Sequence, residues 1–247
     1  MNSPLLVEYF NALPNDALEG GLDWPVSQYT REKDPQATET RTTGKARRRA
    51  AIHIFCKQVR QRYTEGTLLR ALHVGNATMR RAAIFALGML GSPPVNAFLA
   101  DRLHDEDNEV SRLAAEALWS LWFRGENAAH SDELYRILRL RDHKQAIAAL
   151  DDLVGRAPDF PEPFNQRAIL YFQLEQFALS ARDCTTTLKL NPHHFGAQAG
   201  LGQCLLRLQR PRAALRSFLL ALRINPRLDG ISGTVKALEI ALDDDAR

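Results

Sequence analysis

Two short polar stretches have residue types that bind metals, but neither has the full pattern of a site. His193-His194 supplies two adjacent imidazoles with no third ligand in register, whereas a zinc site needs three or four ligands at defined spacing. Residues 105–109, DEDNE, contain acids of a calcium loop but lack its glycine and its distal glutamate. We interpret the histidines as an exposed turn and the acids as a solvated turn that stabilises the positive end of the following helix.

Catalytic patterns are also missing from the sequence. There is no glycine-rich phosphate loop, no GxSxG and no HExxH. Cys56, Cys184 and Cys204 stand singly among apolar residues and outside any CxxC pair, so we expect reduced, buried thiols. His73 and His104 recur at matching places in the chain, which favours a structural role. The sequence therefore predicts no catalytic residue, no cofactor, no metal and a protein that is not an enzyme.

A basic block is the one anomaly of composition. Residues 41–81 carry 11 basic and 1 acidic side chains, whereas residues 1–40 carry 2 basic and 7 acidic ones. A shared basic surface would attract an acidic protein or the phosphates of a nucleic acid, unless segment 1–40 folds over it and neutralises it. All three alternatives stay open. The predicted basic patch consists of Arg47, Arg48, Arg49, Lys57, Arg60, Arg62, Arg80 and Arg81.

The chain shows no sign of a membrane segment. It has no run of 18 apolar residues, and residues 1–8 lack the basic start and long apolar core of a signal peptide. We expect a cytoplasmic protein without membrane partners.

The elements that position these residues are helices, and in the second half of the chain they repeat. Pro158, Pro192 and Pro226 recur at one constant interval. The same offset aligns small residues at three positions (Ala146, Ser180, Ala214) and apolar ones at three others (Leu150, Cys184, Phe218). The pattern therefore predicts that each unit forms two closely packed helices of about 12–14 residues, the second of which ends at the proline. The units are residues 127–160, 161–194 and 195–228.

This pattern resembles the tetratricopeptide repeat, most clearly in FGAQAGLGQCLLRLQRPRAALRSFLLALRINPRL (195–228). The resemblance implies stacked helical hairpins, with residues 230–244 as a capping helix over the exposed end. It also implies that the first helix of each hairpin lines a concave groove for a peptide. The corresponding groove residues are Asn165, Gln166, Ile169, Phe172, Gln173, Ala199, Gln203, Leu206 and Arg207. The Lys and Asn set of carboxylate-clamp members is absent apart from Asn165 and Arg207.

The first half of the chain repeats at a different, slightly shorter offset. Residues 68–90 align with residues 99–121, with matched Leu, His and Ala positions. These paired helices resemble the short HEAT-like repeats of bilin-lyase-type proteins. We assign HEAT-like repeats to residues 45–126 and a partly irregular segment to residues 1–44, in which Leu5 to Leu13 can dock as a helix.

The sequence thus predicts an all-α, right-handed helical-hairpin solenoid, with HEAT-like repeats followed by three tetratricopeptide repeats and a capping helix. Its predicted function is that of a non-catalytic scaffold that binds a peptide or protein on its concave surface. One alternative is a nucleic-acid-binding module that uses residues 41–81. The other is an enzyme related to bilin lyases or other HEAT-like arrays.

Overall fold

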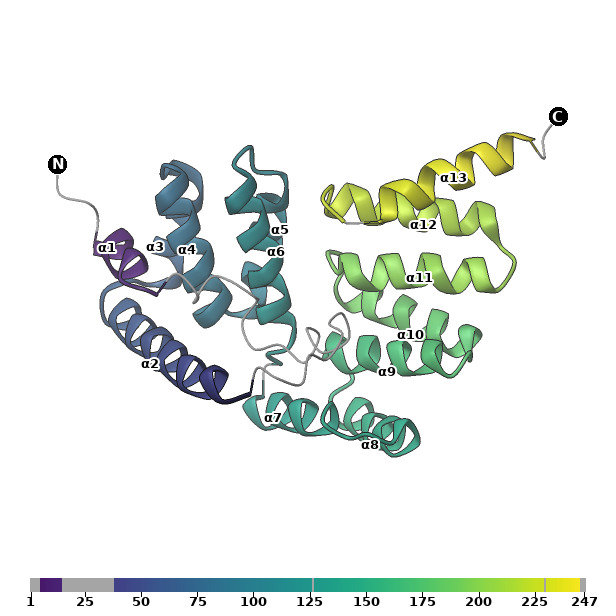
Figure 1. Cartoon of the computed structure of the whole chain (residues 1–247), viewed down its shortest axis with the longest axis horizontal. Coiled ribbons are helices and arrows are strands. Elements are labelled where there is room, and N and C mark those ends of the chain that lie inside the picture. The colour runs from purple at the N-terminus through teal and green to yellow at the C-terminus, as the bar shows by residue number, and fades with distance from the viewer. Residues whose placement is uncertain (1–4, 15–37, 126, 229, 245–247) are drawn as a thin grey trace. The chain divides into compact units, whose positions relative to one another are not determined.

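The computed structural model describes residues 5–14, 38–125, 127–228 and 230–244, and every regular element in these ranges is helical (Figure 1). The predicted all-α class is confirmed. The chain divides into two units, Met1–Leu121 and Trp122–Arg247. No helix in the described ranges is long and apolar enough to cross a membrane. The irregular segment expected before residue 45 lies largely outside the described residues, but helix α2 already begins at Thr38.

Aromatic packing joins the first helices of the N-terminal unit. Helices α1 (Leu5–Asn11), α2 (Thr38–Arg62) and α4 (Ala77–Leu90) contact one another. The Phe85 ring meets the rings of Phe10 and Phe55 edge-on, at centroid distances of 5.9 and 5.1 Å. Such edge-to-face pairs add to the burial of apolar area. The apolar segment near Leu5 is therefore a docked helix, as expected.

Two helix pairs of this unit keep the offset seen in the sequence. Helix α3 (Glu65–Val74) precedes α4, and α5 (Asn96–Asp101) with the 3₁₀ turn η4 (Arg102–His104) precedes α6 (Asn108–Trp122). Each second helix has a side-chain cap at its start: Asn76 Oδ1 accepts from Met79 N, and Asp107 Oδ1 accepts from Val110 N. These caps satisfy backbone donors that a helix start leaves open. The repeat is thus visible in the caps as well as in the core. A further 3₁₀ turn, η3 (Pro93–Val95), links the pairs.

The C-terminal unit is a stack of helical hairpins (Figure 1). Its helices are α7 (Ala128–Ile137), α8 (His143–Arg156), α9 (Pro161–Gln173), α10 (Phe177–Leu190), α11 (Phe195–Arg207), α12 (Pro211–Ile224) and α13 (Ile231–Asp244). The second helices begin after Asp142, Gln176 and Arg210, at the same interval as the prolines. Each helix contacts the next one along the chain. Helix α13 covers the last hairpin, and its Val235 and Leu238 pack with Phe218.

The first helices of two hairpins end in the same strained turn. Glu175 and Gln209, which are at equivalent positions of consecutive repeats, have φ values of 60° and 58°. After them, Gln176 N donates to Tyr171 O at 2.8 Å and Arg210 N donates to Leu205 O at 2.9 Å. This left-handed helix ending favours glycine, because a side chain there is sterically strained.

We expect Gln209→Gly to stabilise the C-terminal unit by about 0.5–1 kcal/mol, because it removes that strain. The control is Gln203→Gly, in the ordinary helical backbone of the preceding helix α11, where glycine costs about 1 kcal/mol. Urea unfolding followed by circular dichroism measures both. A loss of stability in Gln209→Gly similar to that in the control would show that the turn is not strained.

A buried ion-pair network joins adjacent hairpins. Arg167 on α9 donates from Nε and Nη2 to the Asp183 carboxylate at 2.6 and 2.9 Å, and from Nη1 to Asp151 Oδ1 at 2.6 Å. Its guanidinium also lies over the rings of Phe164 and Tyr171. Burial opposes the charge of Arg167, but the hydrogen bonds and charges of the two aspartates outweigh it and raise its pKa. The network therefore ties α8, α9 and α10 together.

Candidate partner-binding surfaces

The outward side of helices α9 and α11 is the predicted groove. These two helices contact each other, and each packs its other side on the second helices α10 and α12. Gln173, Gln203 and Arg207 are exposed, whereas Ile169, Phe172, Ala199 and Leu206 are half-buried. The surface therefore offers two amides and one cation beside a set of partly covered apolar side chains.

Two predicted groove residues are not available to a ligand. Asn165 and Gln166 are only 3% and 2% exposed. Their side-chain amides donate to Glu162 Oε1 at 3.0 and 2.6 Å. The expectation that they face a partner fails, because a buried carboxylate needs hydrogen-bond donors and these amides supply them.

The same carboxylate also meets His194, which the sequence placed in an exposed turn. His194 is fully buried, and its Nε2 lies 3.0 Å from Glu162 Oε2. Its Nδ1 accepts from Ala197 N at 3.0 Å and so caps the start of α11. Because Nδ1 accepts, the proton toward Glu162 is on Nε2. The prediction of an exposed His194 is wrong: the ring is a buried link between two hairpins.

Trp122 completes this buried cluster. Its indole stacks on the His194 ring with centroids 4.0 Å apart and packs against Phe195 at 5.1 Å. The tryptophan is only 4% exposed and is therefore a core aromatic. The chain itself thus fills the space beside the start of α11, and the remaining groove lies toward the carboxyl ends of α9 and α11.

Arg207 forms one corner of that remaining groove. Its guanidinium carbon lies 4.4 Å from the Phe177 ring centroid and 6.0 Å from that of Phe172. The Phe172 and Phe177 rings meet edge-on at 5.3 Å. Arg207 Nη2 is also 3.8 Å from Glu175 Oε1, at an exposed position where an ion pair is weak. The corner presents an aromatic face and a cation that a partner carboxylate can approach.

Leu206 has a second role. Its side chain packs against the cluster of Ala214, Phe218 and Val235. It therefore helps to hold the capping helix as well as facing the groove.

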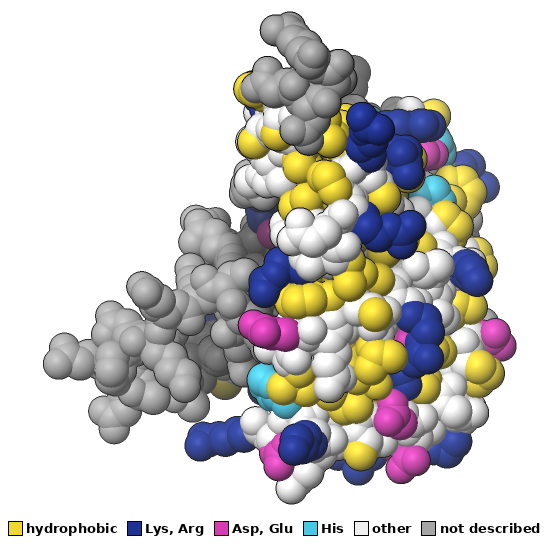
Figure 2. Space-filling view, turned by 90° about the vertical axis from the view of Figure 1, so that its right-hand side faces the viewer, with side chains coloured by type: hydrophobic (Ala, Val, Ile, Leu, Met, Phe, Trp, Pro, Cys, Tyr) yellow, Lys and Arg dark blue, Asp and Glu magenta, His cyan; other side chains and the backbone are white. Residues whose placement is uncertain are grey.

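Outside the groove, the C-terminal unit exposes four more leucines, Leu140, Leu174, Leu219 and Leu220. Seen from the right-hand side of Figure 1, hydrophobic side chains lie between Arg and Lys side chains (Figure 2).

The structure divides the predicted basic patch. Arg47, Arg49, Lys57, Arg60 and Arg62 are exposed on α2, and Arg48 is half-buried there. Arg80 and Arg81 are on α4 and do not extend this surface. Their partners are acids of the DEDNE turn: Arg80 Nη2 is 2.8 Å from Asp105 Oδ1, and Arg81 Nη2 is 2.7 Å from Asp107 Oδ2. The hydrogen bond that Arg80 donates to Asp105 raises the pKa of Arg80, and the one that Arg81 donates to Asp107 lowers the pKa of Asp107.

The DEDNE turn is accordingly only in part the solvated turn that the sequence predicted. Asp105 is 9% exposed and Asp107 caps α6, whereas the Glu106 side chain is 92% exposed. Within the described ranges, no three His, Cys, Asp or Glu side chains gather as a metal site would require. Cys184 and Cys204 are buried and Cys56 is half-buried.

Comparison with known proteins places repeats in the N-terminal unit and finds a repeat-containing relative. Residues 37–119 match the HEAT repeats family. A TPR repeat-containing protein from Rhizobium etli is 31% identical over 81 residues, which make up 33% of this chain and 40% of that protein. The chain thus spans less than half of this relative.

Three solved structures are similar at low identity. The first TPR domain of Spaghetti (RPAP3), bound to the HSP90 peptide SRMEEVD, matches with a TM-score of 0.43 and 21% identity, over 47% of this chain and 92% of that one. MamA MSR-1 C2 matches with a TM-score of 0.41 and 17% identity, over 67% of this chain and 88% of that one. The complex of the yeast Sti1 TPR2AB domain with pHSP90 matches with a TM-score of 0.39 and 15% identity, over 94% of this chain and 88% of that one. The two series of helix pairs, each with its own constant offset, make the described part of the chain an array of helical repeats. Its first series matches HEAT repeats, and the chain is similar to a TPR repeat-containing protein.

Proposed function

We propose that the protein is a non-catalytic interaction scaffold whose C-terminal unit binds a peptide of a partner protein along α9 and α11. One observation carries the proposal: Gln173, Gln203 and Arg207 are exposed on two adjacent helices beside the half-buried Ile169 and Phe172. The opposite sides of these helices are buried against α10 and α12, so the backbone that presents the row is rigid. A preformed surface loses less entropy on binding than a flexible one.

The chemistry of this row indicates the kind of peptide. The two glutamine amides can each donate to and accept from a peptide backbone. Phe172 and Ile169 offer apolar contact, and Arg207 offers a charge for a carboxylate at one end. We therefore propose a peptide with apolar anchors and an acidic residue near Arg207.

One of the similar structures is bound to an HSP90 peptide and another is a complex with pHSP90, but the residues of this chain do not favour such a ligand. Asn165 is buried and donates to Glu162, so it cannot hold a terminal carboxylate as a clamp asparagine would.

The test uses a peptide selected from a displayed random library on the full chain, with affinity measured by fluorescence anisotropy. Gln203→Glu with Arg207→Glu should weaken binding at least tenfold, because it places two carboxylates in the row. The matched control is Arg216→Glu with Leu220→Glu on α12, which has the same spacing and charge change at exposed positions. It should leave the affinity unchanged.

Weakening by the control alone would place the binding surface on the exposed apolar side of α12 and refute the proposal. Both variants must keep the helical circular dichroism and the melting temperature of the parent. All four substituted positions are exposed, and at such positions a change costs about 0.5 kcal/mol or less.

A further inference from the structure

The N-terminal unit has a groove that the proposed function does not use. It lies between α2 and the carboxyl end of α4 and encloses about 770 Å³. Its lining residues are Arg48, Arg49, Ile52, His53, Cys56, Lys57, Arg60, Gln61, Met89 and Leu90. No acidic side chain is among these residues.

The groove follows the axis of α2. Arg49, Ile52, Cys56 and Arg60 recur every three or four residues and so share one side of the helix. From Arg49 to Arg60 this row is about 16 Å long at 1.5 Å per residue. The opposite side of α2 is anchored in the core by Phe55 and Val59, which are 1% and 0% exposed. The groove is therefore built on a fixed helix.

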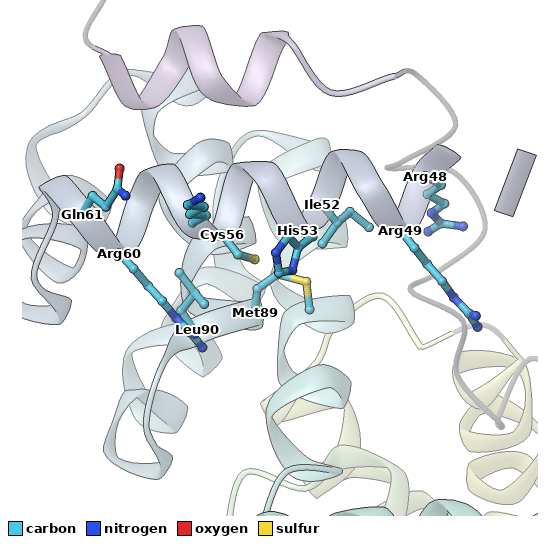
Figure 3. A pocket seen from close by; sticks show the side chains of 10 residues that line it. Arg48, Arg49, Ile52, His53, Cys56, Arg60, Gln61, Met89 and Leu90 are labelled. Carbon is cyan, nitrogen blue, oxygen red and sulfur yellow. The ribbon is translucent and has the colours of Figure 1, made fainter. Parts of the chain in front are cut away.

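Its floor is apolar and its rim is basic. Figure 3 shows Ile52, His53 and Cys56 directed from α2 toward Met89, with Arg49 and Arg60 reaching outward on either side. Ile52, Cys56, Met89 and Leu90 are half-buried, whereas Arg49, Lys57 and Arg60 are exposed. Apolar contact is available at the bottom and positive charge at the edge.

Carboxylates near this unit's other arginines have partners of their own. Asp105 and Asp107 pair with Arg80 and Arg81. Glu116, whose charge acts on Arg48, bonds to Arg112. Burial raises the pKa of Glu116, which weakens it further as a counterion. The lining itself contains no carboxylate, and Lys57 and Arg60 place two exposed positive charges at its rim.

We propose that this groove binds an acidic amphipathic helix of a partner protein. The apolar side of that helix contacts Ile52, Cys56, Met89 and Leu90, and its Asp or Glu residues face Lys57 and Arg60. A helix fits because the groove runs straight along another helix for about three turns. A nucleic acid fits less well, because no aromatic side chain lines the groove for base stacking and the floor is apolar.

The probe is a fluorescein-labelled 14-residue peptide with Leu at helical i, i+4, i+7 and i+11 positions and Glu at the flanking ones. A scrambled peptide of identical composition and a random DNA duplex are the comparison ligands. Anisotropy with the full chain should give saturable binding of the amphipathic peptide, at least tenfold tighter than that of the scrambled one. Equal binding of the two peptides would overturn the proposal.

Paired charge reversals locate the binding. Lys57→Glu with Arg60→Glu changes the groove rim, and Arg47→Glu with Arg62→Glu changes two exposed arginines of the same helix outside the lining. The first variant should weaken the affinity for the amphipathic peptide at least tenfold, and the second variant should weaken it less than threefold. Equal losses would mean diffuse charge attraction, and duplex binding that depends only on the first pair would assign the groove to nucleic acid. Either result refutes an acidic helix.

Cys56 gives a second readout that does not depend on charge. It lies in the groove floor and is half-buried, whereas Cys184 and Cys204 are buried in the other unit. The amphipathic peptide should slow the alkylation of Cys56 at least fivefold, with the same concentration dependence as the anisotropy. If Cys56 resists alkylation without peptide and the peptide does not bind, the chain itself occupies the groove and the proposal fails.

Discussion

Replacing Arg167 by methionine should destabilise the C-terminal unit by about 3–5 kcal/mol. The substitution leaves Asp183, which is 1% exposed, without its two hydrogen-bond donors, and an uncompensated buried charge carries this cost. Asp151 also loses its partner, but its side chain is 52% exposed and water can solvate it. The loss therefore comes mainly from Asp183.

The control is Arg182→Met on the neighbouring residue. The Arg182 side chain is 64% exposed and lies 3.9 Å from the same carboxylate, so its removal should cost less than about 0.5 kcal/mol. Arg167→Met combined with Asp183→Leu should recover part of the lost stability, because no buried charge then remains. Urea unfolding followed by circular dichroism measures all three. If Arg167→Met unfolds like the parent, the network does not link the hairpins.

Replacing Gly202 by phenylalanine should cost more than about 3 kcal/mol, because it overpacks a filled core. Even a Cβ at Gly202 would lie 2.6 Å from Phe218 Cε1 and 2.7 Å from Cδ1. Phe218 is fully buried and packs with Val235 of the capping helix, so it has little room to move. Gly202→Ala should already cost about 1–3 kcal/mol.

A matched control separates the close contact from helix propensity. Gly155 on α8 has no atom within 4 Å of a Cβ built on it. Gly155→Ala should therefore stabilise the unit by up to about 1 kcal/mol. Gly202→Ala with Phe218→Leu should lose less than the sum of the single changes, since the two side chains share one space. A Gly202→Phe protein that melts like the parent would contradict the pairing of α11 with α12.

The repeat architecture could be predicted from the sequence because its constraints are local and recur at a fixed spacing. Prolines follow the second helices of the C-terminal repeats, and small residues such as Gly202 permit close contacts. In the first half, Asn76 and Asp107 cap equivalent helices. Each of these acts within a helix or between adjacent helices. A single sequence therefore contains several copies of the same signal.

The partners of the polar side chains could not be predicted in this way. His194 meets Glu162 from 32 residues away, and Arg80 meets Asp105 from 25 residues away. Sequence position placed Arg80 with the basic residues of α2, but it belongs to a different helix with acids of its own. The amides of Asn165 and Gln166 are at groove positions of the repeat, yet the buried Glu162 takes both. The partner of each polar side chain depends on which charge is buried nearby, and the periodicity of the sequence does not predict which charges are buried.

The groove along α2 also could be predicted only in part. The positive charge of α2 was evident in the composition, but the apolar floor of the groove was not. Met89 and Leu90 come from the end of α4, beyond the basic residues in sequence, and they reach the groove only through the packing of α4 on α2.

The most direct test of the central claim, that α9 and α11 form the partner-binding surface, is nuclear magnetic resonance of the full ¹⁵N-labelled chain titrated with the selected peptide. The side-chain amide signals of Gln173 and Gln203, both exposed, should shift and saturate with the peptide. Those of Asn165 and Gln166, which donate to Glu162, should stay in place. Shifts confined to residues of α10 and α12, with Gln173 and Gln203 unchanged, would contradict it.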